Sequence, residues 1–131
     1  MLDHNSTIPL YKQIANWLET EILKGNFSVD QKVYSQYQLA DMFQINPATA
    51  ARGLSLLGEE GILYDRRGLG KFVSNKATIL IKMKRKDEIM MQLITSLVEE
   101  AHHLDINERS LLQLVSEVYE QKKERNDDDS M

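Results

Sequence analysis

Apolar residues recur at intervals of three and four near the start of the chain, which is the spacing of an amphipathic helix. The stripe runs from Leu10 to Ile22. Pro9 suits the first helical position, because the N–H that it lacks would be unpaired there, and Gly25 is a natural helix stop. The pattern therefore predicts a first helix from about residue 9 to residue 24.

Two shorter helices are expected next, separated by a tight turn. Ser35 and Gln38 have the spacing of a capping box, which predicts a second helix that ends near Phe43. Asn46 as N-cap and Pro47 at the first helical position predict the start of a third helix. Glycines at 58 and 61 mark its end. Two short helices joined in this way form a helix-turn-helix.

A β-hairpin is expected directly after the third helix. Residues 62–65 and 71–74 are rich in apolar side chains, and the segment between them contains Gly68 and Gly70. Short apolar runs on either side of a glycine-containing connection are typical of two antiparallel strands. A hairpin in this position is the wing of a winged helix-turn-helix domain.

The pattern changes from Thr78 onward, where neither glycine nor proline occurs again. Apolar residues at intervals of three and four predict one long amphipathic helix to about residue 104. A break at 102–106, with Asn107 as N-cap, separates it from a second helix. The predicted fold is mostly α with a small β-hairpin. We expect a winged helix-turn-helix domain at 1–76, a two-helix dimerisation region at 77–125 and a disordered acidic tail at 126–131.

Composition narrows the choice of function. The 131 residues contain no cysteine, which excludes disulfides and thiolate metal sites. No apolar run is long enough to span a bilayer, and the first residues lack the features of a signal peptide, so we expect a cytoplasmic protein that does not bind membranes. The net charge of −4 argues against nucleic acid as a partner, but basic residues concentrate locally between residues 52 and 86.

Five segments of the chain, in the same order and at the same spacing, resemble the N-terminal domain of the GntR family of bacterial transcription regulators. The segments are Pro9-Leu10-Tyr11-Lys12-Gln13-Ile14, Ile22-Leu23-Lys24-Gly25, Leu39-Ala40, Ile45-Asn46-Pro47-Ala48-Thr49 and Arg67-Gly68-Leu69-Gly70-Lys71-Phe72-Val73. The short tail resembles the YtrA-type branch, whose C-terminal part is two dimerising helices. The resemblance implies a homodimer that binds operator DNA, usually as a repressor, and often at a transporter operon.

The third helix can lie in the major groove with its N-terminal part facing the bases. Its positions outside the core that we expect to contact DNA are Asn46, Ala48, Thr49 and Arg52. Arg52 is the strongest candidate, because a guanidinium can donate two hydrogen bonds to guanine O6 and N7. The alternative is a solvated residue or an ion-pair partner. Gly53 inside the helix permits close packing or is merely tolerated.

The start of the second helix, with Ser35, Gln36 and Tyr37, is expected to face the phosphate backbone, because helix N-termini favour anions. The sequence departs from the family here. Tyr37 stands where the family commonly has a DNA-contacting Arg, and Ala48 stands where Arg or Asn is frequent. These departures imply weaker or differently selective DNA binding.

The wing supplies the remaining candidates for DNA contact. Gly68 and Gly70 would let its tip approach the sugar-phosphate backbone closely. Arg66, Arg67 and Lys71 flank the tip and suit phosphates or a narrow minor groove. An ordinary solvated hairpin is the other interpretation. If DNA is the partner, we expect these cations and Arg52 to share one face.

The two tail helices supply the expected dimer interface, since two copies of a helix-turn-helix read a palindromic operator. The interface positions are Leu93, Leu97, Ala101, Leu104, Leu111, Val115 and Val118. A small apolar effector bound in the tail is an additional hypothesis. We expect no cofactor and no metal, because the neighbours His102 and His103 point about 100° apart on a helix.

Two rival functions differ in class from a DNA-binding regulator. An enzyme would need a phosphate loop, a nucleophile with its base or a set of metal ligands, and the sequence has none of these. A winged helix that binds other proteins is the alternative. It would expose an apolar patch in place of the cationic face.

Overall fold

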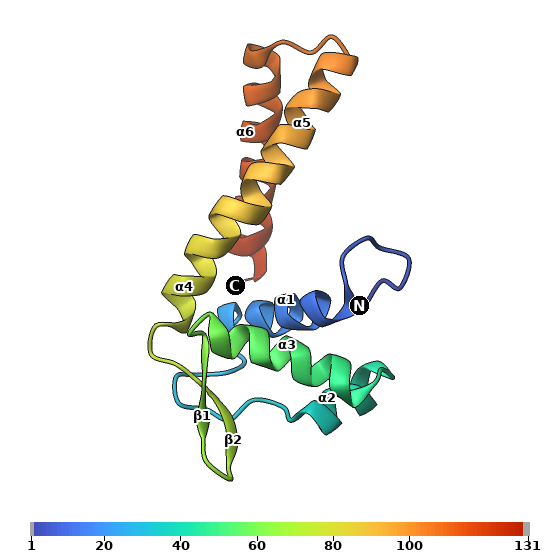
Figure 1. Ribbon diagram of the computed structural model, residues 1–131. Helices are drawn as coiled ribbons and strands as arrows, with labels where there is room; N and C mark the ends of the chain where they lie inside the picture. The colour runs from blue at the N-terminus through green and yellow to red at the C-terminus, as the bar shows by residue number, and fades with distance from the viewer. Residues whose placement is uncertain (1, 130–131) are drawn as a thin grey trace. The chain divides into compact units, whose positions relative to one another are not determined.

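The computed structural model describes residues 2–129, and the side chains of residues 2–126. The chain divides into two compact units, here called the head (Met1–Lys86) and the tail (Asp87–Met131). The helical and strand elements in order are α1 (Leu10–Leu23), α2 (Gln36–Phe43), α3 (Pro47–Glu59), β1 (Leu63–Arg66), β2 (Gly70–Val73), α4 (Ala77–Arg85), the π-helix η1 (Lys86–Met90), α5 (Met91–His103) and α6 (Glu108–Asp129) (Figure 1). The predicted fold class, mostly α with one hairpin, is confirmed.

Local capping signals in the sequence fix the ends of α1. Pro9 is the N-cap, so the helix begins one residue later than predicted. At the other end Gly25 adopts a φ of 85°, which glycine reaches without steric cost. The N–H of Gly25 donates to Ile22 O and the N–H of Asn26 donates to Glu21 O, both at 3.0 Å. This pair of bonds is a Schellman motif, which satisfies carbonyls that the helix end leaves unpaired.

The turn between α2 and α3 is built as the sequence predicts. The side chains of Ser35 and Gln38 form the reciprocal bonds of a capping box at the start of α2. Gln44 ends the helix in the left-handed region, with a φ of 55°. Two residues later Asn46 Oδ1 accepts a hydrogen bond from the N–H of Ala48 at 2.8 Å, and Pro47 opens α3. The tight turn brings α2 against α3.

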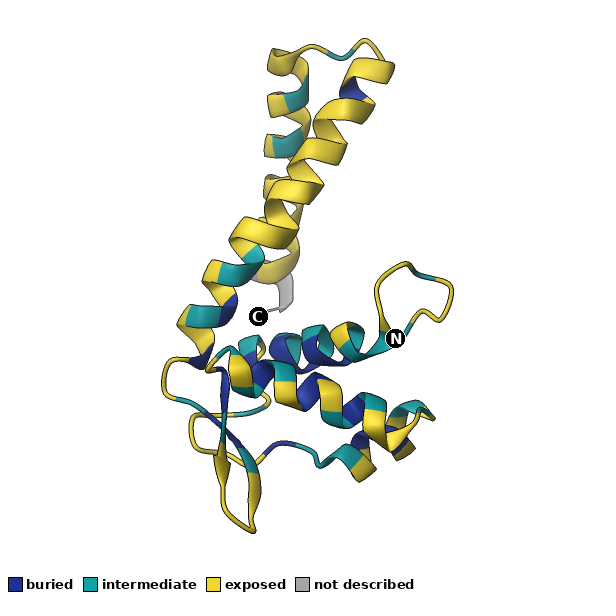
Figure 2. Cartoon of the chain, viewed as in Figure 1, coloured by how far each residue is buried: buried dark blue, intermediate teal, exposed yellow. Residues whose placement is uncertain are grey.

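The core of the head lies where α1, α2 and α3 face one another (Figure 2). Ile14 and Leu18 of α1 pack with Leu39 of α2 and Leu57 of α3, and all four side chains are fully buried. Burial of each such side chain stabilises the fold by about 1.5–3 kcal/mol. The three helices therefore share one apolar core.

The hairpin is antiparallel, with Leu63 opposite Val73 and Arg66 opposite Gly70. The connection between α1 and α2 extends it, because Lys32 forms a β-bridge with Phe72 and Val33 N–H donates to Lys71 O at 3.0 Å. Side chains alternate between the two faces of a strand, so Leu63 and Val73 are buried in the core. These contacts fix the wing to the body of the head.

Helix α4 belongs to the head, and so the division of the chain lies ten residues beyond the expected boundary at 76. Ala77 and Ile81 are buried in the same core as α1 and α3. The reason is the apolar face of α4, which the sequence analysis had assigned to the tail. The single long helix expected from Thr78 is interrupted by η1, in which the hydrogen bonds skip an additional residue.

A buried ionic cluster, here called the α4 clamp, fastens α4 to the head. Glu19 of α1 is fully buried, and its Oε2 accepts a hydrogen bond from Lys84 Nζ at 3.0 Å. Lys84 also donates to Glu60 Oε1 at 3.0 Å. Arg85 Nη2 donates to Asn16 O at 2.6 Å, and its Nε lies 3.6 Å from Glu19 Oε1. A buried charge must be paired and hydrogen-bonded, and Lys84 meets that requirement at Glu19 Oε2. Glu19 Oε1 is paired with Arg85 by charge, but neither this oxygen nor Arg85 Nε has a hydrogen-bond partner among the described residues.

Burial alone would lower the pKa of Lys84, because it penalises the charged form. The hydrogen bonds and the negative charges of Glu19 and Glu60 outweigh burial and raise the pKa above its usual value. Lys84 is therefore held in its charged form at neutral pH.

The tail is a pair of helices joined by a short loop. Ala101 is buried at the end of α5, and its carbonyl accepts a hydrogen bond from Ile106 N–H at 2.8 Å. Asn107 is the cap that the sequence predicts, since its Oδ1 accepts from Ser110 N–H at 2.9 Å. In the part of the chain that the structure describes, no helix is both long and apolar enough to cross a membrane.

Helix α6 continues to Asp129, where the sequence predicts disorder from residue 126. Helix propagation adds a hydrogen bond with each residue, and no proline or glycine stops it here. The last two positions of that prediction, 130 and 131, lie outside the described residues.

Candidate nucleic-acid interface

One stripe of α3 faces away from the core of the head. Ala48, Arg52 and Ser55 follow one another at intervals of four and three, and all three are exposed. Residues at this spacing share one face of a helix. Thr49 lies at the edge of the stripe and is half-buried, while Glu59 continues it at the C-terminal end. This stripe, here called the reading face, has a cation in its middle and a carboxylate at its far end. Of the α3 residues expected to contact DNA, Thr49 is the one that is not fully exposed.

Arg52 makes its contact with α1. Its guanidinium carbon lies 3.9 Å from the centroid of the Tyr11 ring, in the geometry of a cation–π interaction. Tyr11 is half-buried on the first turn of α1. The sequence analysis did not single out Tyr11, because nothing in the chain pattern indicates that residues 11 and 52 are neighbours.

The first turn of α2 presents its three candidates unequally. Tyr37 is 70% exposed, whereas Ser35 and Gln36 are half-buried. The Ser35 hydroxyl accepts a hydrogen bond from Gln38 N–H at 3.1 Å, so it serves as the helix cap. Asn46 likewise serves as the cap of α3, and it is exposed. Tyr37 is the candidate of this turn whose side chain is most open to a ligand.

The turn at the tip of the wing is closed by a hydrogen bond from Leu69 N–H to Arg66 O at 2.9 Å. Gly68 and Gly70 have φ angles of 77° and 110°, so both positions use the conformational freedom of glycine. Arg67 lies in this turn and is exposed. The wing therefore carries one cation at its outermost point.

The other two wing cations lie on opposite faces of the hairpin. Arg66 covers the ring of Phe72, with its guanidinium carbon 4.5 Å from the ring centroid, and donates to Tyr64 Oη at 3.2 Å. Lys71 lies on the face of Asp65 and pairs with it at 2.8 Å. Alternation along paired strands thus separates Lys71 from Arg66. Lys71 lines a shallow hollow with Ser55 and Glu59 of α3, so it lies on the α3 side of the hairpin.

Lys32 is a cation near the wing that the sequence analysis did not propose for DNA contact. It is exposed, and a Cβ atom added to Gly70 would lie 3.1 Å from its Cε. The β-bridge to Phe72 places it there. Only its basic character was visible in the sequence, since the bridge joins residues that are forty positions apart.

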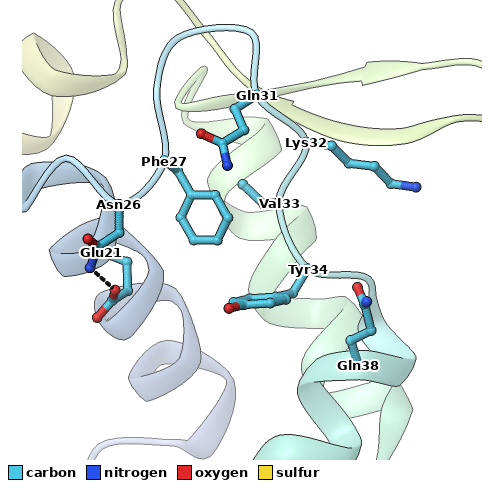
Figure 3. A pocket seen from close by; sticks show the side chains of 8 residues that line it. All are labelled: Glu21, Asn26, Phe27, Gln31, Lys32, Val33, Tyr34 and Gln38. Carbon is cyan, nitrogen blue, oxygen red and sulfur yellow. Dashed lines mark hydrogen bonds between the residues drawn. The ribbon is translucent and has the colours of Figure 1, made fainter.

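A polar pocket of about 530 Å³ lies between the end of α1, the following connection and the first turn of α2 (Figure 3). The rings of Phe27 and Tyr34 meet edge to face, with centroids 5.3 Å apart, and form its apolar part. Glu21 accepts a hydrogen bond from Asn26 at 2.5 Å on one side, and Gln38 lies on the other. None of the residues predicted for DNA contact lines this pocket.

The tail exposes most of its apolar side chains (Figure 2). Leu93 is 66% exposed and Val118 is 57% exposed, and Leu97 and Leu104 are exposed as well. Ala101 is buried, and Leu111 and Val115 are half-buried. A groove of about 380 Å³ between α5 and α6 is lined by Leu97, Leu111, Leu114, Val115, Val118, Tyr119 and the stem of Lys122. The structure thus brings four of the seven predicted interface residues to one groove.

Metal ligands do not gather within the described residues, where no three His, Cys, Asp or Glu side chains lie close enough to hold an ion. His102 and His103 are both exposed at the end of α5.

No family model matches the chain. A solved GntR-family transcriptional regulator from Listeria monocytogenes shares its fold over 88% of this chain and 98% of the other, with a TM-score of 0.70 and 29% identity. By sequence and by fold, the chain resembles the GntR-family transcription regulators. The HTH-type transcriptional repressor YtrA of Bacillus subtilis is 26% identical to it over 89% of both chains. This match extends into the tail, so the likeness to the YtrA-type branch is confirmed.

A second solved structure holds the DNA-binding domain of AraR in complex with an operator. It resembles 56% of this chain and is covered over 89% of its own length, with a TM-score of 0.50 and 27% identity. The chain spans 14% and 37% of the length of two other Bacillus subtilis regulators that it matches. The likeness to longer regulators is thus confined to part of their length.

Proposed function

We propose that this protein is a dimeric, DNA-binding transcription repressor that reads a palindromic operator with α3. The observation that carries the proposal is the exposed stripe of α3, which presents Arg52 between the small side chains of Ala48 and Ser55. Small neighbours leave room for a base edge, and a guanidinium can bond guanine at two points. The AraR domain, a structural relative, has been solved on its operator.

Repression is proposed because YtrA, which this chain matches over most of its length, is named a repressor. The target implied by the likeness to YtrA-type regulators is a transporter operon. Such a role places the protein in the cytoplasm, where operator DNA lies.

Contacts with the phosphate backbone are proposed for residues on two sides of the reading face. At the start of α2, Tyr37 is the exposed donor, while Ser35 and Gln36 offer the helix N-terminus. At the wing, Arg67 is exposed at the tip, and Gly68 and Gly70 give the tip its shape. Lys32 lies beside the wing and joins this set. Lys71 contributes less, because Asp65 neutralises its charge.

The experiment that tests DNA binding is selection of bound duplexes from a random pool, followed by affinity measurements at several salt concentrations. A palindrome is the expected result, and recovery of no preferred sequence would overturn the proposal. Arg67→Ala should reduce the salt slope of binding by about one unit, as for the loss of one phosphate contact. Lys71→Ala is the matched control and should change the slope less, because that lysine is already paired.

Dimerisation is proposed through the groove between α5 and α6 and the exposed side chains around it. A pair of helices with this much exposed apolar surface indicates a protein interface. A second copy offers the same surface, and symmetric association buries both. A small apolar effector bound in the groove would compete with the second subunit and so lower affinity for the operator.

Leu97→Asp tests the interface, because Leu97 lines the groove and is 44% exposed. Sedimentation should find monomers for this variant and dimers for the natural sequence. Gln113→Asp adds the same charge at an exposed polar position of α6 and should leave the dimer intact. A Leu97→Asp variant that remains dimeric would exclude this groove as the interface.

A further inference from the structure

The side chains of Arg52 and Tyr11 are in direct contact in the head. The guanidinium carbon lies 3.9 Å from the ring centroid, which is close for a cation–π pair. Arg52 belongs to the exposed stripe of α3, whereas Tyr11 belongs to the first turn of α1. The contact therefore connects the reading face of α3 to a helix outside the helix-turn-helix.

Gly53 is the residue that makes this contact geometrically accessible. It is buried inside α3, and a Cβ atom at this position would lie 2.8 Å from the carbonyl oxygen of Tyr11 and 3.1 Å from Ile14 Cγ2. Both distances are shorter than ordinary van der Waals contact. Only glycine lets the start of α1 approach so near to α3, and this approach brings the ring of Tyr11 beside residue 52.

Whether Arg52 contacts a carboxylate or an aromatic ring decides whether its charge and its N–H donors remain available to a ligand. Among the residues that the structure describes, Arg52 forms no ion pair, unlike Lys71 with Asp65 and Arg85 with Glu19. A carboxylate partner would cancel the positive charge and occupy N–H donors. An aromatic face holds the guanidinium plane and leaves its charge and its N–H edges available for another acceptor.

We propose that Tyr11 is a positioning residue that sets the base specificity of Arg52. It orients the guanidinium over the flank of the reading face, so that both of its donor edges can reach one guanine in the operator half-site. The proposal rests on the proposed DNA-binding function. Loss of the ring should therefore lower discrimination at one base pair and leave the rest of the binding site unaffected.

The test uses the full chain and the duplex selected by the natural protein, with a set of duplexes that change each base pair in turn. Arg52→Ala identifies the base pair that depends on the arginine. Tyr11→Leu should weaken binding to the selected duplex by about two- to fivefold, the range expected for an exposed cation–π contact. It should also reduce discrimination at the base pair that Arg52→Ala identifies. Tyr11→Phe keeps the aromatic face and should bind as the natural protein does.

Two further variants separate positioning from folding. Tyr11→Met fills a similar volume without a π face and should behave as Tyr11→Leu does, with thermal unfolding showing that each variant is folded. Introduced into the Arg52→Ala background, Tyr11→Leu should have no additional effect on affinity. A uniform loss of affinity over all duplexes, or discrimination equal to that of the natural protein, would overturn the positioning role. A natural protein that selects no duplex would instead overturn the proposed function.

Discussion

The head and the tail differ in where their apolar side chains lie. The head buries residues of four helices and the hairpin in one core. In the tail Ala101 is buried and Leu111 and Val115 are half-buried, but most of the other leucines, valines and methionines are exposed. Both regions have helices with an apolar stripe, so the sequence pattern alone does not distinguish them. We infer from this difference that the head carries its own stability, and the proposed dimer would give the tail the partner that its exposed apolar side chains need.

Separating the two regions should have the largest effect. We expect a fragment of residues 1–86 to unfold cooperatively and to do so independently of concentration, because its core and the α4 clamp lie within it. A fragment of residues 87–131 should be largely unfolded when dilute and gain helix as its concentration rises, because association is what buries its apolar surface. Circular dichroism during urea titration at several concentrations measures both. A dilute tail fragment that unfolds cooperatively as a monomer would contradict the comparison.

The elements of the head were predictable because short-range signals set their ends. The capping box at Ser35, the N-cap at Asn46 and the glycine at position 25 each act within about four residues. That α4 packs in the head could not be predicted from such short-range signals. It depends on Ile81 reaching the core and on Lys84 reaching Glu19, which is 65 positions earlier.

The residues of the candidate site also fall into two groups, those that short-range patterns predict and those that distant contacts bring to the site. The exposed stripe of α3 follows from helical spacing, and so Ala48 and Arg52 could be chosen from the sequence. Tyr11 and Lys32 could not, because each reaches the site through a contact with a distant segment. The pairing of Lys71 with Asp65 depends on the register of the hairpin. A register shift of one residue would have placed the two side chains on opposite faces.

Removing the central cation of the α4 clamp should be the next largest effect. Lys84→Met leaves Glu19 fully buried with only Arg85 near it, so we expect the free energy of unfolding to fall by about 3 kcal/mol, as for a buried ion pair that loses one partner. Lys82→Met is the matched control, because Lys82 is exposed on the same helix. Urea titration of the full chain provides the measurement. Equal effects of the two substitutions would show that the clamp does not stabilise the head.

Two glycines of α3 should respond in opposite directions to substitution by alanine. Gly53→Ala should lower the free energy of unfolding by about 1 kcal/mol, because overpacking against Tyr11 O and Ile14 outweighs the gain in helix propensity. Gly58→Ala should raise it by roughly 0.5–1 kcal/mol, since its nearest neighbour, Lys71 Nζ, is at an ordinary 3.5 Å. Thermal or urea unfolding of both variants compares them directly. The idea of a required close approach fails if Gly53→Ala is as stabilising as Gly58→Ala.

The smallest expected effect is the pH dependence that Lys84 gives to the head. Its pKa is raised in the folded state, so the folded protein retains this proton more strongly than the unfolded chain does. The stabilisation is fully present below the unfolded pKa of about 10.4 and is lost as the pH rises through the folded pKa. The stability difference between the natural protein and Lys84→Met should therefore be constant from neutral pH to about pH 9.5 and shrink above it. Urea titrations of the two proteins across this range measure the difference, which cancels the titration of the other lysines and the tyrosines. A difference that grows with pH would mean that the charge on Lys84 opposes folding. In that case Lys84 would link α4 to the head through apolar packing of its long side chain and not through its ion pairs.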